Sequence, residues 1–313
     1  MLNGIALRRF LLEHTQLSEI EIAVLKNVSR LSHPMKMIQG MVPLLDLTPR
    51  SELGMELEKD ISKGLILAAK MVALVTSMHR LKIDEPILST RKECSFVENF
   101  FFLYHGRNPT EAELRVFEIA QILQIEHGFN ASTFTARVAA STGTPLECAV
   151  SSAVGSLFGP LHGGADEASL QTMLDVGPKE NAGAFVEKMF ASKQKIMGMG
   201  HREYKVMDPR ARILKSVARE MTIDTPLEGL YATFDAVENA VRMKAEDLKK
   251  KIEPNVEFYK GLVFYALGFS PIYFTSLFAT SRVYGYISHI AENNRNNRII
   301  RPKAFYVGDS NFG

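Results

Sequence analysis

Residues 261–281 read GLVFYALGFSPIYFTSLFATS and carry no formal charge. A run of this length could cross a bilayer. Gly268 and Pro271 divide it, however, Arg282 follows at once, and serine, threonine and tyrosine recur within it. Proline ends or kinks a helix because it lacks a backbone N–H donor. The stretch therefore predicts two buried helices that meet at a break, at the centre of the protein.

Helix starts recur along the rest of the chain, whereas strand patterns are nearly absent. Four places match the S/T-x-x-E capping box, in which each side chain binds a free amide of the first helical turn. These places are Ser18 with Glu21, Thr110 with Glu113, Thr144 with Glu147, and Thr225 with Glu228. Apolar residues recur between these starts at helical spacing, as at Phe234, Val237 and Val241. We therefore expect an all-α protein.

Prolines and glycines mark where these helices begin and end. Pro145, Pro209 and Pro226 stand at expected first helical positions, where the missing N–H costs nothing. Gly128 and Gly143 stand at expected helix ends. No repeat or flexible linker interrupts the chain, so we expect any second domain to be a packed insertion.

Composition limits the classes of function. The 313 residues are 46% hydrophobic, enough for one large core or two domains. With 37 Lys+Arg against 35 Asp+Glu, the net charge is only +2, which gives no general reason to expect nucleic acid or a membrane as partner. Cys94 and Cys148 are too few for a disulfide framework, and the N-terminus lacks a targeting signature, so we expect a cytoplasmic protein.

Three patches carry the candidate chemistry: HGGA at 162–165, GMGHREYKVMDPRA at 198–211, and PNVEFYKG at 254–261. His162 precedes two glycines and an expected helix. The positive end of a helix keeps a histidine neutral, which suits a hydrogen-bond donor to a developing enolate oxygen. A lone histidine could equally be a satisfied structural residue.

The second patch places a histidine among glycines and cations. His201 follows Gly198 and Gly200, which let a ligand approach the backbone closely. Asp208 and Pro209 interrupt any single solvated helical face, so an anion pocket is the better interpretation. The cations of this region are Lys193, Lys195, Arg202, Lys205, Arg210 and Arg212.

Other motifs are absent from the sequence. A dinucleotide site would need a third glycine where Glu203 stands. None of the eight histidines forms an HxxxH or HExxH pair, so we expect no metal site. There is no GxSxG elbow and no P-loop.

Five segments resemble, in order and spacing, the signatures of the citrate synthase family. They are HGFNASTFTARV, GPLHGGADEA, GMGHREYKVMDPRA, IEPNVEFYKGLVFYALG and RIIRPKAFYVG, and the likeness extends from about His33 to Gly308. The resemblance implies an all-helical homodimer whose active site is completed by the partner chain. It also implies a large domain at 1–164 and 263–313, with a small domain at 165–262 that closes over the substrates.

The resemblance implies an acyltransferase that condenses acetyl-CoA with oxaloacetate and hydrolyses the thioester to give citrate and CoA, in the tricarboxylic acid cycle. Acetyl-CoA is a substrate, and no cofactor or metal is expected. His162 would hold the thioester oxygen, His201 would polarise the ketone of oxaloacetate, and Glu257 would be the base. The family has an aspartate where Glu257 stands, so this carboxylate is one methylene longer.

Substrate-binding residues follow from the same resemblance. His127, Arg210 and Arg282 would bind oxaloacetate, together with Arg301 from the other subunit. A dicarboxylate requires the planar, bidentate guanidinium that lysine cannot replace. Ser132 would position a water or a backbone group, or would simply be a first-turn hydroxyl. The candidates for the phosphates of CoA are Lys195, Arg202, Lys205 and Arg298.

Two alternatives stay open at this point. One is a 2-methylcitrate synthase that uses propionyl-CoA, because a hydrophobic pocket discriminates one methylene by only about 1–3 kcal/mol. The other is a family member with impaired catalysis that acts as a binding or regulatory protein, for which Glu257 is the motivation. Against the second, the other polar catalytic and clamp positions match the family.

Overall fold

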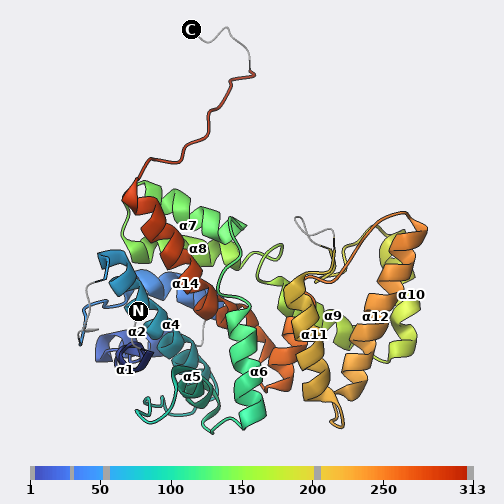
Figure 1. Ribbon diagram of the computed structural model, residues 1–313, viewed down its shortest axis with the longest axis horizontal. Coiled ribbons are helices and arrows are strands. Elements are labelled where there is room, and N and C mark those ends of the chain that lie inside the picture. Colours follow the sequence, from blue (N-terminus) through green and yellow to red (C-terminus); the bar gives the residue numbers. More distant parts are fainter. Residues whose placement is uncertain (1–3, 29–31, 52–56, 201–205, 309–313) are drawn as a thin grey trace.

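Helices form the whole framework of the protein in this computed structural model, which describes residues 4–28, 32–51, 57–200 and 206–308 (Figure 1). Within these ranges there are α-helices and short 3₁₀ segments but no β-strand, and an isolated bridge joins Met199 to Pro254. The prediction of an all-α protein is therefore confirmed.

The helices fall into two groups on either side of the molecule (Figure 1). The first group is α1 Gly4–His14, α2 Glu19–Val28, α3 Pro34–Met41, η1 Val42–Leu44, α4 Lys59–Lys82, α5 Phe96–His105, α6 Glu111–Ile122, α7 Ala131–Ser141 and α8 Leu146–Leu157. The second group is α9 Ala165–Val176, η2 Lys179–Asn181, α10 Ala182–Ala191, α11 Pro209–Thr222, α12 Glu228–Asp247 and α13 Val256–Ala266. η3 Pro271–Tyr273 and α14 Phe274–Arg295 then return to the first group, where α14 packs against α4, α7 and α8.

The predicted break in the uncharged stretch is confirmed. α13 ends at Ala266, Gly268 adopts a positive φ of 81°, and Pro271 opens η3 directly before α14. Both helices lie in the core, with Leu262 and Leu277 fully buried. The stretch therefore joins the two groups of helices through the centre of the protein.

α4 also has the length and apolar composition of a membrane span, and among the described helices it alone does. However, 78% of its most apolar stretch is buried inside the protein, where it packs against α14 and α5. Core helices of globular proteins have the same character.

Helix starts agree only partly with the capping patterns. Ser18 and Thr110 form the predicted reciprocal bonds, and Ser95 with Glu98 forms a further capping box that the analysis missed. The boxes at Thr144 and Thr225 are wrong. The Thr225 hydroxyl donates to the carbonyl of Thr222 at 2.7 Å and accepts from the backbone N–H of Leu227 at 3.2 Å. α12 begins only at Glu228, so Glu228 is not the third helical residue that the predicted box requires.

The proline and glycine boundaries are also mixed. Pro209 is the first residue of α11, as predicted, with Asp208 as its N-cap. Pro145 is an N-cap rather than a first residue, and α12 begins two residues after Pro226. Gly143 follows α7 with a φ of 80°, as predicted, whereas Gly128 lies well beyond the end of α6.

A glycine sets the distance between α13 and α9. A Cβ at Gly261 would lie 2.7 Å from the carbonyl oxygen of Asp166 and 3.4 Å from the Cβ of Leu170. Real Cβ atoms do not approach backbone so closely, so any larger residue would push the two helices apart. The absence of a side chain at Gly261 therefore allows the second turn of α13 to pack closely on the start of α9.

We expect Gly261→Ala to destabilise the protein by about 1–3 kcal/mol, because overpacking at a close helix contact forces backbone shifts. Urea unfolding followed by circular dichroism measures this change. Gly183→Ala is the matched control, since Gly183 also lies in a helix but has open space around its Cβ position. Equal stabilities for the two variants would contradict the steric explanation.

Candidate functional site

A cavity of about 1020 Å³, here called the central cavity, opens where the ends of several helices meet. Its wall includes five residues that the sequence analysis singled out: His127, His162, Arg210, Glu257 and Arg282. Apolar residues complete the wall, among them Phe129, Phe134, Leu161 and Phe278. Two guanidinium cations, two imidazoles and one carboxylate thus share one apolar-walled space.

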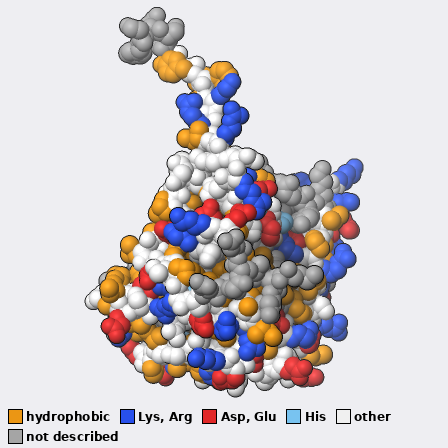
Figure 2. Space-filling view, turned by 60° about the vertical axis from the view of Figure 1, so that its left-hand side comes forward, with side chains coloured by type: hydrophobic (Ala, Val, Ile, Leu, Met, Phe, Trp, Pro, Cys, Tyr) orange, Lys and Arg blue, Asp and Glu red, His pale blue; other side chains and the backbone are white. Residues whose placement is uncertain are grey.

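The remaining candidate residues do not line the described part of this cavity. Lys195, Arg298 and Arg301 are exposed. Asn297 and Ile300 are hydrogen-bonded to Ser141 of α7. Beyond them, residues 301–308 form an exposed, extended segment that leaves the body of the protein (Figure 1) and carries a mixture of apolar and basic side chains (Figure 2). His201, Arg202 and Lys205 lie outside the described residues.

His162 stands in the turn between α8 and α9. Its pKa is lowered to about 4, chiefly because burial disfavours the charged ring; the negative charge of Glu257 opposes this effect and the positive charge of Arg282 adds to it. The predicted neutrality of this imidazole therefore has burial as its main cause, rather than the end of a helix.

Ser132 decides which nitrogen of His162 carries the proton. Its hydroxyl lies 2.8 Å from Nε2, and its backbone N–H points at the same nitrogen at 3.4 Å. An amide can only donate, so Nε2 is the acceptor and the neutral ring carries its proton on Nδ1. Tyr286 donates to the Ser132 hydroxyl at 2.8 Å and fixes its position. Nδ1–H is therefore the donor that His162 can offer to a ligand.

Arg282 is a buried cation with unused hydrogen-bonding capacity. It lies in the middle of α14 with 1% of its surface exposed. Its Nε donates to the carbonyl of Gln124 at 2.7 Å, and its guanidinium lies over the Phe278 ring at 4.7 Å. Its Nη1 is buried and has no hydrogen-bond partner among the described residues. A buried cationic donor without a hydrogen-bond partner raises the free energy of the folded protein, so an anionic ligand fits this position.

Arg210 brings a second guanidinium to the same space from the first turn of α11. It is held by the buried N-cap Asp208, with Nη2 to Oδ2 at 2.7 Å and Nε to Oδ1 at 3.1 Å. Its Nη2 also lies 3.4 Å from Nε2 of His127. Burial is the main reason that the pKa of Arg282 is lowered, and the positive charge of Arg210 adds to this effect. Both cations line the central cavity.

Glu257 lies in the first turn of α13 and lines the central cavity. The N-cap Asn255 accepts from the backbone N–H of Glu257 at 3.0 Å and donates from Nδ2 to the carbonyl of Gly200 at 2.8 Å. One asparagine therefore ties the start of this helix to the residue before His201. The sequence analysis missed Asn255, although asparagine is a common N-cap.

The two glycines before His201 serve different purposes. Both have positive φ angles, 79° at Gly198 and 85° at Gly200. A Cβ at Gly198 would lie 2.7 Å from the Cα of Phe258, whereas Gly200 has open space and lines the cavity. The expected close approach of a ligand is thus wrong for Gly198, where the backbone of α13 comes close instead.

Two buried charged residues next to Glu257 were not predicted from the sequence. Lys260 and Asp166 are both fully buried, with 3.2 Å between Nζ and Oδ2. The available signal was a lysine inside the apolar run VEFYKGLVFY, because lysine is almost never fully buried without a partner.

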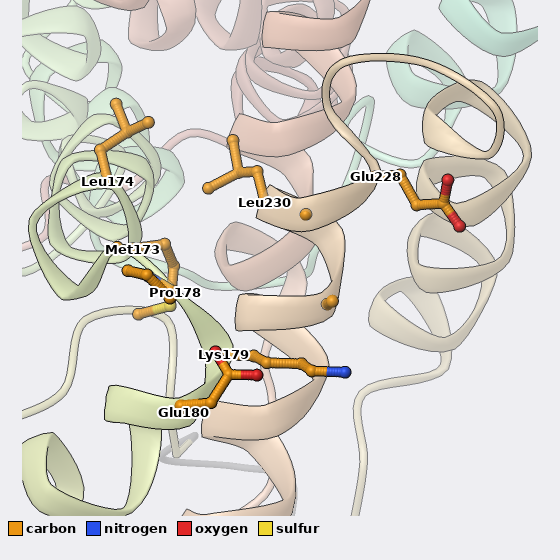
Figure 3. A pocket seen from close by; sticks show the side chains of 10 residues that line it. Met173, Leu174, Pro178, Lys179, Glu180, Glu228 and Leu230 are labelled. Carbon is orange, nitrogen blue, oxygen red and sulfur yellow. The ribbon is translucent and has the colours of Figure 1, made fainter.

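A second cavity of about 630 Å³ lies between α9, η2 and the start of α12 (Figure 3). Leu174 and Leu230 lie at one end of it, and Lys179 and Glu180 at the other (Figure 3). None of the predicted site residues lines it. Over the described parts of the chain, no three His, Cys, Asp or Glu side chains gather in a way that could hold a metal ion.

Comparison with known proteins gives one consistent family. A family model described as citrate synthase, C-terminal domain, matches residues 5–303. Citrate synthase 2 of Bacillus subtilis is 37% identical over 276 residues, which cover 88% of this chain and 73% of that protein. The 2-methylcitrate synthase of Shewanella oneidensis is 34% identical over 293 residues, 92% of this chain and 75% of that protein.

Solved structures agree with this result. The crystal structure of citrate synthase from Thermotoga maritima superposes with a TM-score of 0.85 at 31% identity, covering 98% of this chain and 80% of that chain. The Thermoplasma acidophilum citrate synthase, solved as a ternary complex with carboxymethyl coenzyme A and oxaloacetate, has a TM-score of 0.85 at 28% identity. It covers 97% of this chain and 80% of that chain.

Burial of His162 predicts a pH-dependent stability. The unfolded chain protonates this ring below about pH 6.5, whereas the folded chain does so only below about pH 4. Between these values the unfolded state binds more protons, so the free energy of unfolding falls as the pH is lowered. We expect His162→Gln to reduce this slope by up to one proton, about 1.4 kcal/mol per pH unit, in urea unfolding.

The pH dependence of the unfolding free energy that remains in His162→Gln serves as an internal control. Burial also lowers the pKa of His79 and of His105 to about 4, so their contribution should persist in the variant. A slope that His162→Gln leaves unchanged would contradict the buried, neutral state of this ring.

Proposed function

This chain belongs to the citrate synthase family of acyltransferases, and we propose that its central cavity condenses acetyl-CoA with oxaloacetate. Members of this family form citrate in the tricarboxylic acid cycle, with acetyl-CoA as a substrate and without a cofactor. One observation carries the proposal: His162 and Glu257 line the same cavity as Arg210 and Arg282. A hydrogen-bond donor, a base and a cationic clamp are the groups that proton removal next to a carbonyl requires.

Oxaloacetate binds first in this proposal, through its two carboxylates. Arg282 offers the unsatisfied Nη1, and Arg210 is held in place by Asp208. Two guanidinium groups in an apolar-walled space favour a dianion over a monoanion, because each bidentate pair adds charge-assisted hydrogen bonds. His127 contributes a further polar contact, and His201 polarises the ketone.

Proton removal from acetyl-CoA is the next step. The Glu257 carboxylate takes a proton from the methyl group, while Nδ1–H of His162 donates to the developing enolate oxygen of the thioester. A neutral imidazole suits this role, since it donates a hydrogen bond without surrendering its proton. The low pKa of His162 and the acceptor contacts at its Nε2 support this assignment.

Carbon–carbon bond formation follows. The enolate carbon attacks the ketone carbon of oxaloacetate, and the ketone oxygen takes up a proton with the help of His201. Water then hydrolyses the citryl thioester, which releases citrate and CoA. Lys195, Arg202, Lys205 and Arg298 are proposed to bind the phosphates of CoA.

The assembly belongs to the same proposal. Residues 165–262 act as a small domain that closes over the substrates, and residues 1–164 with 263–313 form the large domain. The chain works as a cytoplasmic homodimer in which Arg301 reaches the partner's cavity. The exposed, extended segment that carries Arg301 supports this exchange, because it has the reach to leave its own subunit.

A 2-methylcitrate synthase is the alternative, and the similarity to the Shewanella oneidensis protein of that name supports it. The two activities differ by one methyl group on the acyl chain, which an apolar wall separates by about 1–3 kcal/mol. Release of CoA from acetyl-CoA and from propionyl-CoA, each with oxaloacetate, distinguishes them. Release from neither would favour a binding or regulatory role.

We expect Glu257→Gln to lower kcat for CoA release by about 10²–10⁴-fold, because the amide cannot accept the methyl proton. The KM for oxaloacetate should change little, since the arginines are untouched. Glu257→Asp is the matched variant and should retain activity, because it keeps the carboxylate and changes only its reach. Parent-like turnover by the glutamine variant would show that another group is the base.

A shared active site predicts complementation between inactive chains. Arg301→Ala and His201→Ala should each be inactive as homodimers, whereas their heterodimer should contain one intact site. We expect up to half of the parental turnover per heterodimer, measured after subunit exchange that mass spectrometry verifies. Verified heterodimers without activity would contradict the contribution of Arg301 in trans.

A further inference from the structure

Lys260 and Asp166 form an ion pair that is sealed from solvent beside the central cavity. Both residues are fully buried, and Nζ of Lys260 lies 3.2 Å from Oδ2 of Asp166. Lys260 comes from α13 and Asp166 from the first turn of α9, at the contact that Gly261 keeps close. The pair therefore sits between the helix that carries Glu257 and the turn that carries His162.

The ammonium and the carboxylate of this pair leave hydrogen-bonding capacity unused. Neither Nζ of Lys260 nor Oδ2 of Asp166 makes a hydrogen bond to any described residue. The ammonium also lies 3.9 Å from the centre of the Phe278 ring, a residue of the cavity wall. Burying two charges costs more than such a contact returns unless further partners are present, so stability alone does not explain the pair.

The ammonium is also directed toward the proposed base. Nζ of Lys260 lies 4.0 Å from Oε1 of Glu257, one helical turn away on the same helix. At this separation, a small movement of the glutamate would close a charge-assisted hydrogen bond. Asp166 lies 3.2 Å from the same ammonium and attracts it, and both side chains are fully buried, which limits the movement of Lys260.

We infer that Lys260, held by Asp166, is a positioning residue that fixes the Glu257 carboxylate and stabilises its negative charge beside the central cavity. The inference rests on the proposed function, in which Glu257 is the base. A glutamate has one more rotatable bond than an aspartate, and a fixed cation limits where its carboxylate can lie. It also offsets the loss of water around a carboxylate when substrate binds.

The charges around Glu257 come from four elements. Lys260 lies on α13, Asp166 on α9, His162 in the turn before α9, and Arg282 on α14. Burial raises the pKa of Asp166, and the charge of Lys260 opposes that effect. His162 is neutral, and Arg282 is assigned to oxaloacetate. Lys260 is thus the cation among the described residues that is within 4 Å of this carboxylate.

The first test is Lys260→Met, which keeps the length of the side chain and removes its charge. We expect kcat for CoA release to fall about 10- to 100-fold, as for other small displacements of a reacting group. The KM for oxaloacetate should stay within about twofold. The acidic limb of the kcat profile should move to higher pH, because the carboxylate has lost its stabilising cation.

A double variant separates positioning from folding. Asp166→Asn with Lys260→Met removes both buried charges, so the parental unfolding midpoint should return. The kcat for CoA release and the acidic limb of its pH profile should stay the same as in Lys260→Met. Recovery of parental kcat by the double variant would overturn the inference, because the single defect would then be a folding defect.

A matched control comes from another buried pair, Lys70 with Glu21, whose closest approach is 2.6 Å. Lys70 is on α4, and neither residue lines the central cavity. Glu21→Gln with Lys70→Met should therefore leave kcat and its pH profile unchanged. A loss of kcat equal to that of the Lys260 variants would show a general effect of removing buried charges and would overturn the inference.

A readout without turnover separates this inference from the proposed function. In protein labelled at the glutamate carboxyl carbons, the signal that Glu257→Gln removes belongs to Glu257. This signal should titrate at higher pH in Lys260→Met than in the parent, whether or not the parent releases CoA. An unchanged titration would overturn the inference, whereas a parent without CoA release would overturn the proposed function alone.

Discussion

The contact between α13 and α9 at Gly261 is the constraint on which the site depends. Because no side chain stands there, the second turn of α13 packs directly on the first turn of α9 at Asp166. Glu257 lies one turn earlier on α13, and His162 lies in the turn that leads into α9. A base and a hydrogen-bond donor from distant parts of the sequence are brought to one cavity by this packing, and the bonds of Asn255 extend the arrangement to Gly200.

The electrostatics of the central cavity follow from burial. Desolvation keeps His162 neutral, and it lowers the pKa of Arg282 without removing the charge of a guanidinium. The two kinds of side chain thus respond differently to the same environment. The imidazole becomes a neutral donor, whereas the guanidinium stays a cation that an anionic ligand can satisfy. This division of roles suits a site that binds a dianion and stabilises an enolate.

Several buried polar groups in this region reduce stability unless a ligand or a neighbouring charge compensates them. Arg282 retains an unsatisfied Nη1, and neither Nζ of Lys260 nor Oδ2 of Asp166 has a hydrogen-bond partner among the described residues. The apolar core around α13 and α14 supplies the compensating stabilisation, since most of their side chains are fully buried. Rigid core helices therefore hold charges that would be mobile on a loop.

The sequence by itself determined the helical class, the break at Gly268 and Pro271, and the family, because these depend on local backbone preferences and on ordered motifs. It also identified five residues of the cavity wall, although the chemical roles of these residues stay predictions. Local patterns failed where the backbone took another course, as at Thr225, whose hydroxyl contacts Thr222 and Leu227 while α12 begins only at Glu228. Only the tertiary structure decided that Ser132 fixes the proton of His162 and that Lys260 meets Asp166. Such pairs join residues far apart in the chain, and their distances depend on how closely whole helices pack, which no local pattern encodes.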